Sequence, residues 1–156
     1  MAKAPELGSI GVQIDEKDWI LLKHLQKDAR LSFAALGRAA GLSAPAAAER
    51  LRRLEQTGVV AGHHTRIRPE ELGLELRAFV EIQVKRPDYA RFQKAVEKLQ
   101  WVLECHHVSG RGSFLMKVAV PNVAGLELLI GHLSAFGDTM TSLILSDVID
   151  RREFHP

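Results

Sequence analysis

The stretch LGRAAGLSAPAAAERLRRLEQTG, residues 36–58, contains two short helical patterns that meet at Gly41-Leu42. The second pattern begins with a run of small residues after Ser43 and then carries three arginines. A helix that only filled a core would have bulky apolar side chains in its first turn. The small start and the basic continuation therefore call for a second explanation, which the neighbouring sequence supplies.

Two more helical segments precede this helix. Asp15 is placed to cap a helix that ends near Lys27-Asp28, and Ser32 is placed to cap a second helix over 33–40. Ser43 caps the third helix, which the periodicity carries to about residue 57. Three short helices with a glycine turn between the last two predict a helix-turn-helix.

In a helix-turn-helix the N-terminal part of the last helix enters the DNA major groove. Side chains there must be small enough to allow approach, or long enough to reach base edges and phosphates. The residues that we expect to contact DNA are Ser32, Ser43, Ala44, Pro45, Ala46, Glu49, Arg50 and Arg53. An alanine-rich helix in a plain bundle would show the same spacing, so spacing alone does not separate the two interpretations.

The charge is distributed unevenly along the chain. Residues 1–68 hold 11 Lys/Arg against 7 Asp/Glu, a net +4, whereas residues 69–156 hold 10 against 12, a net −2. A basic N-terminal part points weakly to a polyanion such as double-stranded DNA as its partner.

After residue 58 the periodicity changes from helix to strand. Two β-prone pieces around Gly62 predict a small hairpin, or wing, and 77–85 alternates as a strand with Ala78, Val80, Ile82 and Val84 on one face. The order that follows, ending in a strand over 139–149, is β-α-β-β-α-β, a ferredoxin-like arrangement. The expected fold is therefore α+β. Its expected parts are a mobile N-terminal arm over 1–14, a winged helix-turn-helix over 15–68, a linker over 69–76 and a βαββαβ domain over 77–156, to which the family resemblance given next assigns ligand sensing and oligomerisation.

The chain resembles the Lrp/AsnC, or feast/famine, family of transcription regulators. The similar segments are IDEKDWILLKHLQKDARLS, LGRAAGLSAPAAAERLRRLEQTGVVAGH, VLECHHVSGRGSFLMKV and DTMTSLILSDV. The resemblance implies a sequence-specific DNA-binding regulator that responds to a small effector, usually an amino acid. It also implies a homodimer formed through the sheet, and dimers that often assemble into octameric rings.

The resemblance places the effector at two segments. The family has a glycine followed three residues later by aspartate, and here that loop is Gly110, Arg111, Gly112 and Ser113. Ser113 replaces the aspartate, so either the ligand differs, Arg111 reads a carboxylate, or the site is lost; an aspartate at this position is expected to strengthen amino-acid binding. Thr139 and Thr141 match the family's T-x-T and are the other candidate effector residues.

Other classes of function find less support in the sequence. The two histidines within each of the pairs His63-His64 and His106-His107 would point to opposite faces of a strand, so neither pair can bind one ion by itself. We therefore expect no metal site, and we also expect no cofactor. Cys105 is expected to be a small buried hydrophobe rather than a nucleophile, and no catalytic motif indicates an enzyme. No membrane span or secretory signal is expected, and a cytoplasmic protein fits the single cysteine. The alternative function is a ligand-sensing or assembly module without sequence-specific DNA binding, and an enzyme ranks below it.

Overall fold

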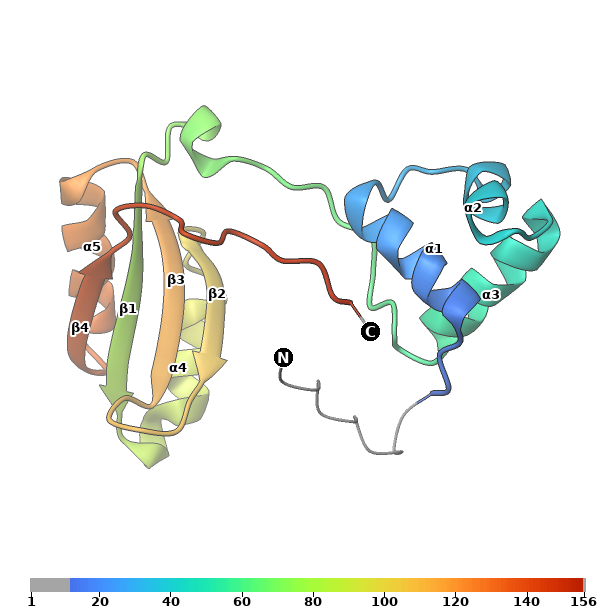
Figure 1. Cartoon of the computed structure of the whole chain (residues 1–156). Coiled ribbons are helices and arrows are strands. Elements are labelled where there is room, and N and C mark those ends of the chain that lie inside the picture. The colour runs from blue at the N-terminus through green and yellow to red at the C-terminus, as the bar shows by residue number, and fades with distance from the viewer. Residues whose placement is uncertain (1–11, 156) are drawn as a thin grey trace, which may run out of the picture. The chain divides into compact units, whose positions relative to one another are not determined.

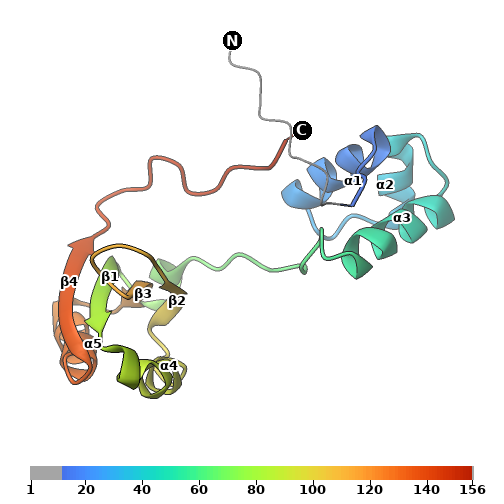
Figure 2. The ribbon, with the colours of Figure 1, turned by 90° about the horizontal axis from the view of Figure 1, so that it is seen from below.

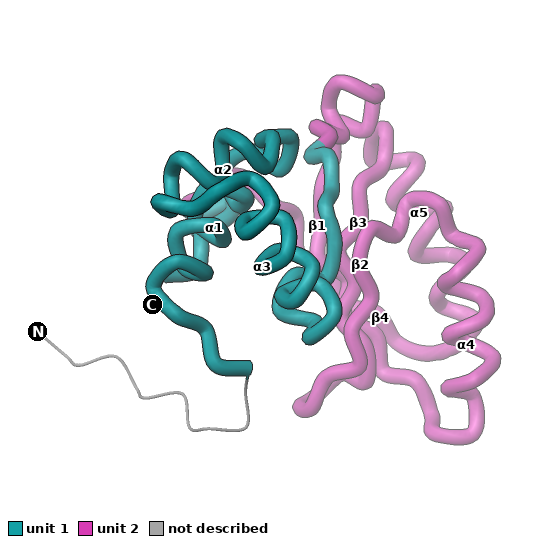
Figure 3. Tube along the Cα trace, turned by 90° about the vertical axis from the view of Figure 1, so that its right-hand side faces the viewer, with its two compact units in different colours: residues 1–66, 149–156 teal, residues 67–148 magenta. Residues whose placement is uncertain are grey.

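The computed structural model describes residues 12–155, and these residues form two compact units. One unit holds the described residues up to Arg66 together with those from Ile149 onward, and the other is Ile67–Val148. Figure 1 shows the course of the chain and Figure 3 distinguishes the two units. The predicted arm over 1–14 lies almost entirely outside the described residues. No helix in the described part of the chain has the length and apolar character needed to cross a membrane.

The first unit contains the three predicted helices, which are confirmed. They are α1 (Glu16–Lys27), α2 (Phe33–Ala40) and α3 (Ala44–Gln56). The side chains of the three predicted N-caps each accept a hydrogen bond from the backbone N–H three residues further on; these caps are Asp15, Ser32 and Ser43. Gly41 ends α2 with φ 63°, a left-handed conformation that glycine adopts without steric cost. The helices enclose a buried cluster of Leu21, Leu36, Ala40 and Ala47.

The predicted wing is not formed. Residues 59–68 contain no strand, and residues 61–68 are exposed. The backbone N–H of Val60 donates a hydrogen bond to the carbonyl of Leu54 near the end of α3. This N–H is therefore not available to a hairpin partner. A two-stranded hairpin with nothing packed on its face is marginal in water, so β-prone composition around Gly62 is not enough to form one.

The second unit is a four-stranded antiparallel sheet with two main helices, and the predicted β-α-β-β-α-β order is confirmed. The strands are β1 (Leu76–Val84), β2 (Val102–His107), β3 (Phe114–Val120) and β4 (Gly137–Leu143). The helices are α4 (Tyr89–Val96) and α5 (Val123–Leu133), with short 3-10 turns at Pro69–Leu72 and Arg86–Asp88. The strand order is β2-β3-β1-β4, so β1 and β3 are central and β2 and β4 are edges.

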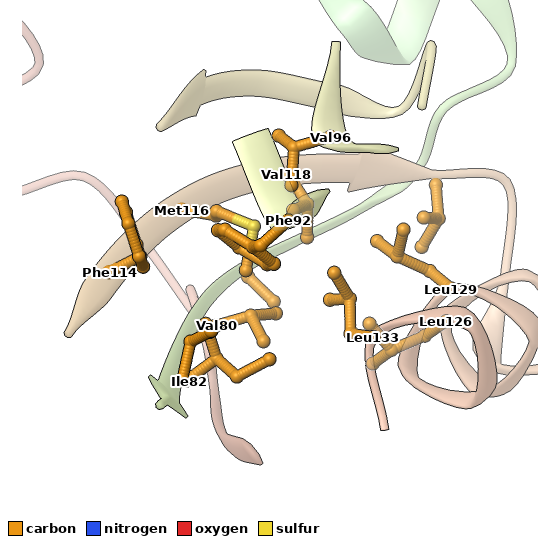
Figure 4. Close-up of a cluster of buried hydrophobic side chains, with 13 residues drawn as sticks. Val80, Ile82, Phe92, Val96, Phe114, Met116, Val118, Leu126, Leu129 and Leu133 are labelled. Carbon is orange, nitrogen blue, oxygen red and sulfur yellow. The ribbon is translucent and has the colours of Figure 1, made fainter. Parts of the chain in front are cut away.

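Both helices cover the same face of this sheet, as Figure 2 shows. The predicted alternation of β1 is confirmed, since Ala78, Val80 and Ile82 are fully buried on the covered face. Side chains from β3, α4 and α5 complete this core, which Figure 4 shows in close-up. The opposite face, which we call the open face, carries the alternate residues of each strand. Phe79 is 41% exposed and Met140 is 59% exposed on it.

The last strand is shorter than the predicted 139–149. It ends at Leu143, which pairs with Ala78, and only one further ladder bond follows, from the N–H of Ile144 to the carbonyl of Arg77. β4 is an edge strand whose sole partner is β1, and β1 begins at Leu76. The β-prone residues beyond 144 therefore have no partner strand left, and Leu145 and Val148 are almost fully exposed.

The chain passes between the two units twice. Residues next to each passage form ion pairs, and every such pair lies within a single unit. In the second unit, the Arg77 guanidinium lies 3.4 Å from the Glu70 carboxylate and 2.8 Å from that of Asp147. Arg77 thus binds one residue from the segment that enters the sheet unit and one from the segment that leaves it.

The C-terminal residues bind within the first unit. Arg66 pairs with Asp150, and the Gln26 side chain on α1 makes two hydrogen bonds with the backbone of Phe154. The Gln26 amide nitrogen donates to the Phe154 carbonyl at 3.1 Å, and its oxygen accepts from the Phe154 N–H at 2.8 Å. The end of the chain is therefore attached to the helix-turn-helix unit.

Substitution by alanine is expected to have opposite effects on the stability of the sheet unit at two of its glycines. A Cβ on Gly137 would overlap the backbone oxygen of Gln83, whereas one on Gly131 in α5 meets nothing within 4 Å. We expect Gly137→Ala to destabilise the unit by ~1–3 kcal/mol, because β1 and β4 must separate. Gly131→Ala should stabilise it by ~0.5–1 kcal/mol through helix propensity. Urea unfolding measures both, and equal stabilities of the two variants would contradict the close approach of β4 to β1.

Candidate nucleic-acid interface and effector loop

The first turn of α3 presents a small surface. Ser43 accepts a hydrogen bond from the Ala46 N–H at 3.3 Å, and Pro45 follows in the first turn, where its missing N–H costs no helical bond. Pro45 is exposed, and Ala44 and Ala46 are half-buried. At the start of α2, Ser32 makes the corresponding bond from the Ala35 N–H at 3.2 Å. Both serines therefore have a confirmed capping role, and their contact with DNA stays a prediction.

Arg50 and Arg53 take part in a charge cluster with α1. The Asp18 carboxylate is fully buried, and it accepts a hydrogen bond from Arg50 Nη1 at 3.0 Å on Oδ1 and one from Arg53 Nη2 on Oδ2. Arg50 Nη1 also donates to Asp15 Oδ2 at 2.5 Å. The sequence pattern assigned both arginines to DNA alone, and this contact with α1 was missed.

The carboxylates of Asp15 and Asp18 also cap α1. Asp15 accepts from the Asp18 N–H at 2.9 Å, and Asp18 accepts from the Asp15 N–H at 3.1 Å. The bond from the Asp18 N–H and the contact with Arg50 lower the pKa of Asp15 below 3.8, because both stabilise the ionised form. The N-terminus of α1 is therefore bound to α3 by an ionised pair at neutral pH.

The arginines keep part of their surface despite these bonds. The side chain of Arg50 is 29% exposed and that of Arg53 is 45% exposed. They line a shallow groove together with Glu49 and Gln56. A guanidinium has five N–H donors, so one bond from Arg53 to Asp18 leaves donors free for a phosphate oxygen or a base edge.

Arg52 is an exposed arginine that is not among the residues expected from the sequence to contact DNA. Its side chain is 59% exposed and pairs with Glu49 on the same helix. Arg52, Glu49 and Pro45 recur at helical spacing along the exposed side of α3. These residues lie on the side of α3 away from the buried Leu51 and Leu54.

The loop between β2 and β3 is tied to the end of β1 by Ser113. The Ser113 hydroxyl donates to the Val84 carbonyl at 3.0 Å and accepts from the Val84 N–H at 3.2 Å. The Ser113 N–H also bonds to the Ile82 carbonyl at 2.9 Å. An aspartate cannot donate to the Val84 carbonyl, so Ser113→Asp removes a structural hydrogen bond besides adding a charge. This cost weakens the expectation that the substitution would improve ligand binding.

A carboxylate that the sequence pattern did not assign to the effector site lies against this loop; alternation along its strand placed it on the face expected to meet a partner. A Cβ on Gly112 would be 2.6 Å from Glu81 Oε1 and closer still to Glu81 Cγ, so Gly112 leaves the space that Glu81 fills. Glu81 is half-buried on the open face, opposite Leu115 of β3 and Met140 of β4. A carboxylate on β1 therefore stands beside the loop whose own aspartate is replaced by Ser113.

Thr139 and Thr141 lie at the same end of the sheet as the loop 110–113. They are on β4, however, which is not adjacent to β2 or β3, the strands that the loop joins. They pair with Ile82 and Val80, so β1 separates them from β3. Directly paired residues share a face, which puts both threonines on the covered face and Glu81 on the open one. Within one protomer the threonine side chains thus point away from Glu81, and their role at an effector site stays a prediction.

The remaining candidates have ordinary environments. Cys105 is exposed, contrary to the expected burial, because β2 is an edge strand. Neighbouring groups still remove part of the water around its sulfur, and this desolvation raises the pKa of the thiol. His106 lies 3.3 Å from Glu104, and the His107 ring contacts those of Tyr89 and Phe114. The part of the chain that the structure describes contains no group of three or more His, Cys, Asp and Glu that could hold a metal ion.

A helix-turn-helix unit followed by an α+β sheet unit is the arrangement typical of regulators that bind DNA and respond to a small effector. Residues 14–55 match the AsnC-type helix-turn-helix domain, and residues 77–154 match the Lrp/AsnC ligand binding domain. The chain belongs to the Lrp/AsnC family of transcription regulators. The resemblance seen in the sequence is thereby confirmed, as is the expected α+β fold.

Named relatives agree with this assignment. The leucine-responsive regulatory protein of Escherichia coli strain K12 is 37% identical over 145 residues, which cover 88% of each chain. Among solved structures, LrpC of B. subtilis has a TM-score of 0.85 at 30% identity, covering 90% of this chain and 100% of that chain. A feast or famine regulatory protein from M. tuberculosis, complexed with L-methionine, has a TM-score of 0.84 at 33% identity, covering 92% and 100%.

Proposed function

We propose that this regulator reads its operator with the first turn of α3 and with the arginines that follow on that helix. The observation that carries this proposal is the combination of a small capped first turn at Ser43 with an exposed stripe of Pro45, Glu49 and Arg52. Small side chains allow the helix into the major groove, and arginines reach guanine or phosphate oxygens. The eight DNA-contacting residues named from the sequence remain part of this proposal.

We also propose that the protein acts as a homodimer formed through the open face. Phe79 and Met140 are exposed apolar side chains on a sheet face that no helix of the same unit covers. A dimer places two recognition helices for two half-sites about 10 bp apart, which gives more specificity than one helix can. Assembly of dimers into an octamer, as the family resemblance implies, and action in the cytoplasm complete this proposal.

The effector that fits best is an amino acid or a related zwitterion. One relative of known structure carries L-methionine, and relatives of this length are named leucine-responsive. We propose that Glu81 supplies the carboxylate for the ammonium group at the loop 110–113, with Arg111 available for the ligand's carboxylate. Thr139 and Thr141 contribute from the other face only if a second protomer completes the site.

Replacing Arg50 or Arg53 by alanine tests the recognition helix. We expect each substitution to weaken binding to a duplex selected from a random-sequence pool by ~1–3 kcal/mol. Arg91→Ala, which removes the same charge from α4, is the matched control and should change this affinity little. Fluorescence anisotropy measures the affinities, and circular dichroism checks that α1 to α3 remain folded. A folded double variant with unchanged affinity would sink the assignment.

Phe79→Glu tests the dimer. A charge placed on both copies of the open face meets its own symmetry mate, so dimerisation should weaken at least about tenfold. Leu128→Glu, on the exposed side of α5, introduces the same charge at a residue that is 62% exposed and should leave a dimer intact. Sedimentation velocity at micromolar concentration distinguishes the outcomes. An unchanged protein that is monomeric, or a Phe79→Glu variant that still dimerises, contradicts the proposal.

Glu81→Gln tests the effector site. Calorimetry with L-methionine and L-leucine on the unchanged protein should show binding, and loss of the carboxylate should weaken it by ~1.5–3 kcal/mol, the scale of a hydrogen bond to a charged group. Glu127→Gln on α5 is the charge-matched control. Equal affinity of the unchanged protein and Glu81→Gln would remove Glu81 from the site, and a lack of binding of both amino acids would remove these two as effectors.

A further inference from the structure

Asp18 is the one buried polar or charged side chain among the residues that the structure describes. It lies on α1, which the proposed reading of DNA does not use. Burying an ionised carboxylate costs several kcal/mol unless hydrogen bonds and opposite charges compensate for lost water. At Asp18 the compensation comes from the Asp15 N–H and from the two arginines of α3.

The spacing of these charges fixes the position of one helix on the other. Asp15 and Asp18 are separated by three residues at the start of α1, and Arg50 and Arg53 are separated by three residues on α3. Residues at this spacing lie on one side of a helix. Arg50 spans both carboxylates, and Arg53 reaches Asp18 alone. A two-point attachment of this kind resists both sliding and rotation of α3 against α1.

The attachment also sets the direction of the guanidinium groups. Both arginines line the groove along α3 while one side of each is held by a buried acceptor. An arginine restrained on one side keeps its remaining donors in a fixed fork, which lowers the entropy lost when a phosphate or a base edge is bound.

We propose that Asp18 is a positioning residue for DNA binding. Without touching DNA, it holds α3 in place on α1 and aims Arg50 and Arg53 outward for recognition. The inference rests on the proposed DNA contact of α3, and it adds the residue through which that contact is organised.

Electrostatics and positioning predict opposite signs for the removal of this carboxylate. A negative charge in a DNA-binding unit repels phosphates, so neutralising it should tighten binding to every sequence if charge alone mattered. If Asp18 positions the arginines, its neutralisation should weaken binding to the selected site and leave binding to unrelated DNA unchanged or tighter. The ratio of the two affinities therefore reports positioning.

The experiment compares Asp18→Asn with Glu16→Gln in the full chain. Glu16 lies in the same turn of α1, is exposed and provides the matched loss of one negative charge. The probes are the duplex selected from a random-sequence pool and a scrambled duplex of the same length, each titrated at several salt concentrations. We expect Asp18→Asn to lower the ratio of selected to scrambled affinity at least about fivefold, and Glu16→Gln to leave that ratio unchanged.

A double-mutant cycle shows whether Asp18 acts through Arg53. In an Arg53→Ala background, Asp18→Asn should lower the ratio much less than in the unchanged protein, whereas in an Arg52→Ala background the effects should add. If Asp18→Asn does not fold, Asp18→Glu takes its place, because glutamate keeps the charge but moves the carboxylate from the position at which it meets Arg50 and Arg53. Glu16→Asp, which also shifts a carboxylate by one methylene in the same turn, is then the control, and a lowered ratio for Asp18→Glu alone is the expected result.

The outcomes separate this inference from the proposed function. An unchanged protein that shows no preference for the selected duplex contradicts DNA reading by α3 itself. A protein that reads the duplex, but whose folded Asp18→Asn variant keeps or raises the affinity ratio, overturns the positioning role and leaves the proposed function standing. The same holds if Asp18→Glu, used as the substitute, keeps the ratio.

Discussion

Alternation along β1 determines what each face of the sheet unit can do. Ala78, Val80 and Ile82 are buried under α4 and α5, and the residues between them are therefore presented on the open face. Because β1 is central and pairs with both β3 and β4, its register determines which residues of those two strands lie on the covered face and which lie on the open face. The same register brings Glu81 beside Gly112 and sends Thr139 to the covered face.

The helix-turn-helix unit has a different kind of constraint, because its buried apolar cluster is small. Four buried residues form that cluster, two of which are alanines, and Leu51 and Leu54 of α3 are buried besides. Ion pairs between the start of α1 and the middle of α3 add a directional attachment that alanine contacts cannot provide. Arg50 and Arg53 therefore belong to the packing of the unit as well as to the surface that we propose for DNA, and a substitution there affects both.

The parts of the fold that could be predicted from the sequence are those with local causes. The caps at Asp15, Ser32 and Ser43 and the alternation of β1 predicted helix starts and a strand face, because neighbours in the chain decide them. The errors arose where a distant partner decides. The strand expected to reach residue 149 ends at Leu143 because β1 supplies no further partner, and Cys105 is exposed because β2 is an edge. The roles of Asp18 and Glu81 were missed for the same reason, since each depends on a contact with a residue more than 30 positions away.

The chain passes between the two units twice, and this affects how the protein can be divided into fragments. A fragment that stops in the segment 67–76 keeps α1 to α3 but loses Asp150 and Phe154, the partners of Arg66 and Gln26. A fragment that starts there carries those C-terminal residues without the helix that binds them. An affinity tag is better placed at the N-terminal end for the same reason, since a bulky C-terminal fusion follows directly on the residues bound to α1. Measurements on isolated halves will therefore report each unit with one of its own attachments removed.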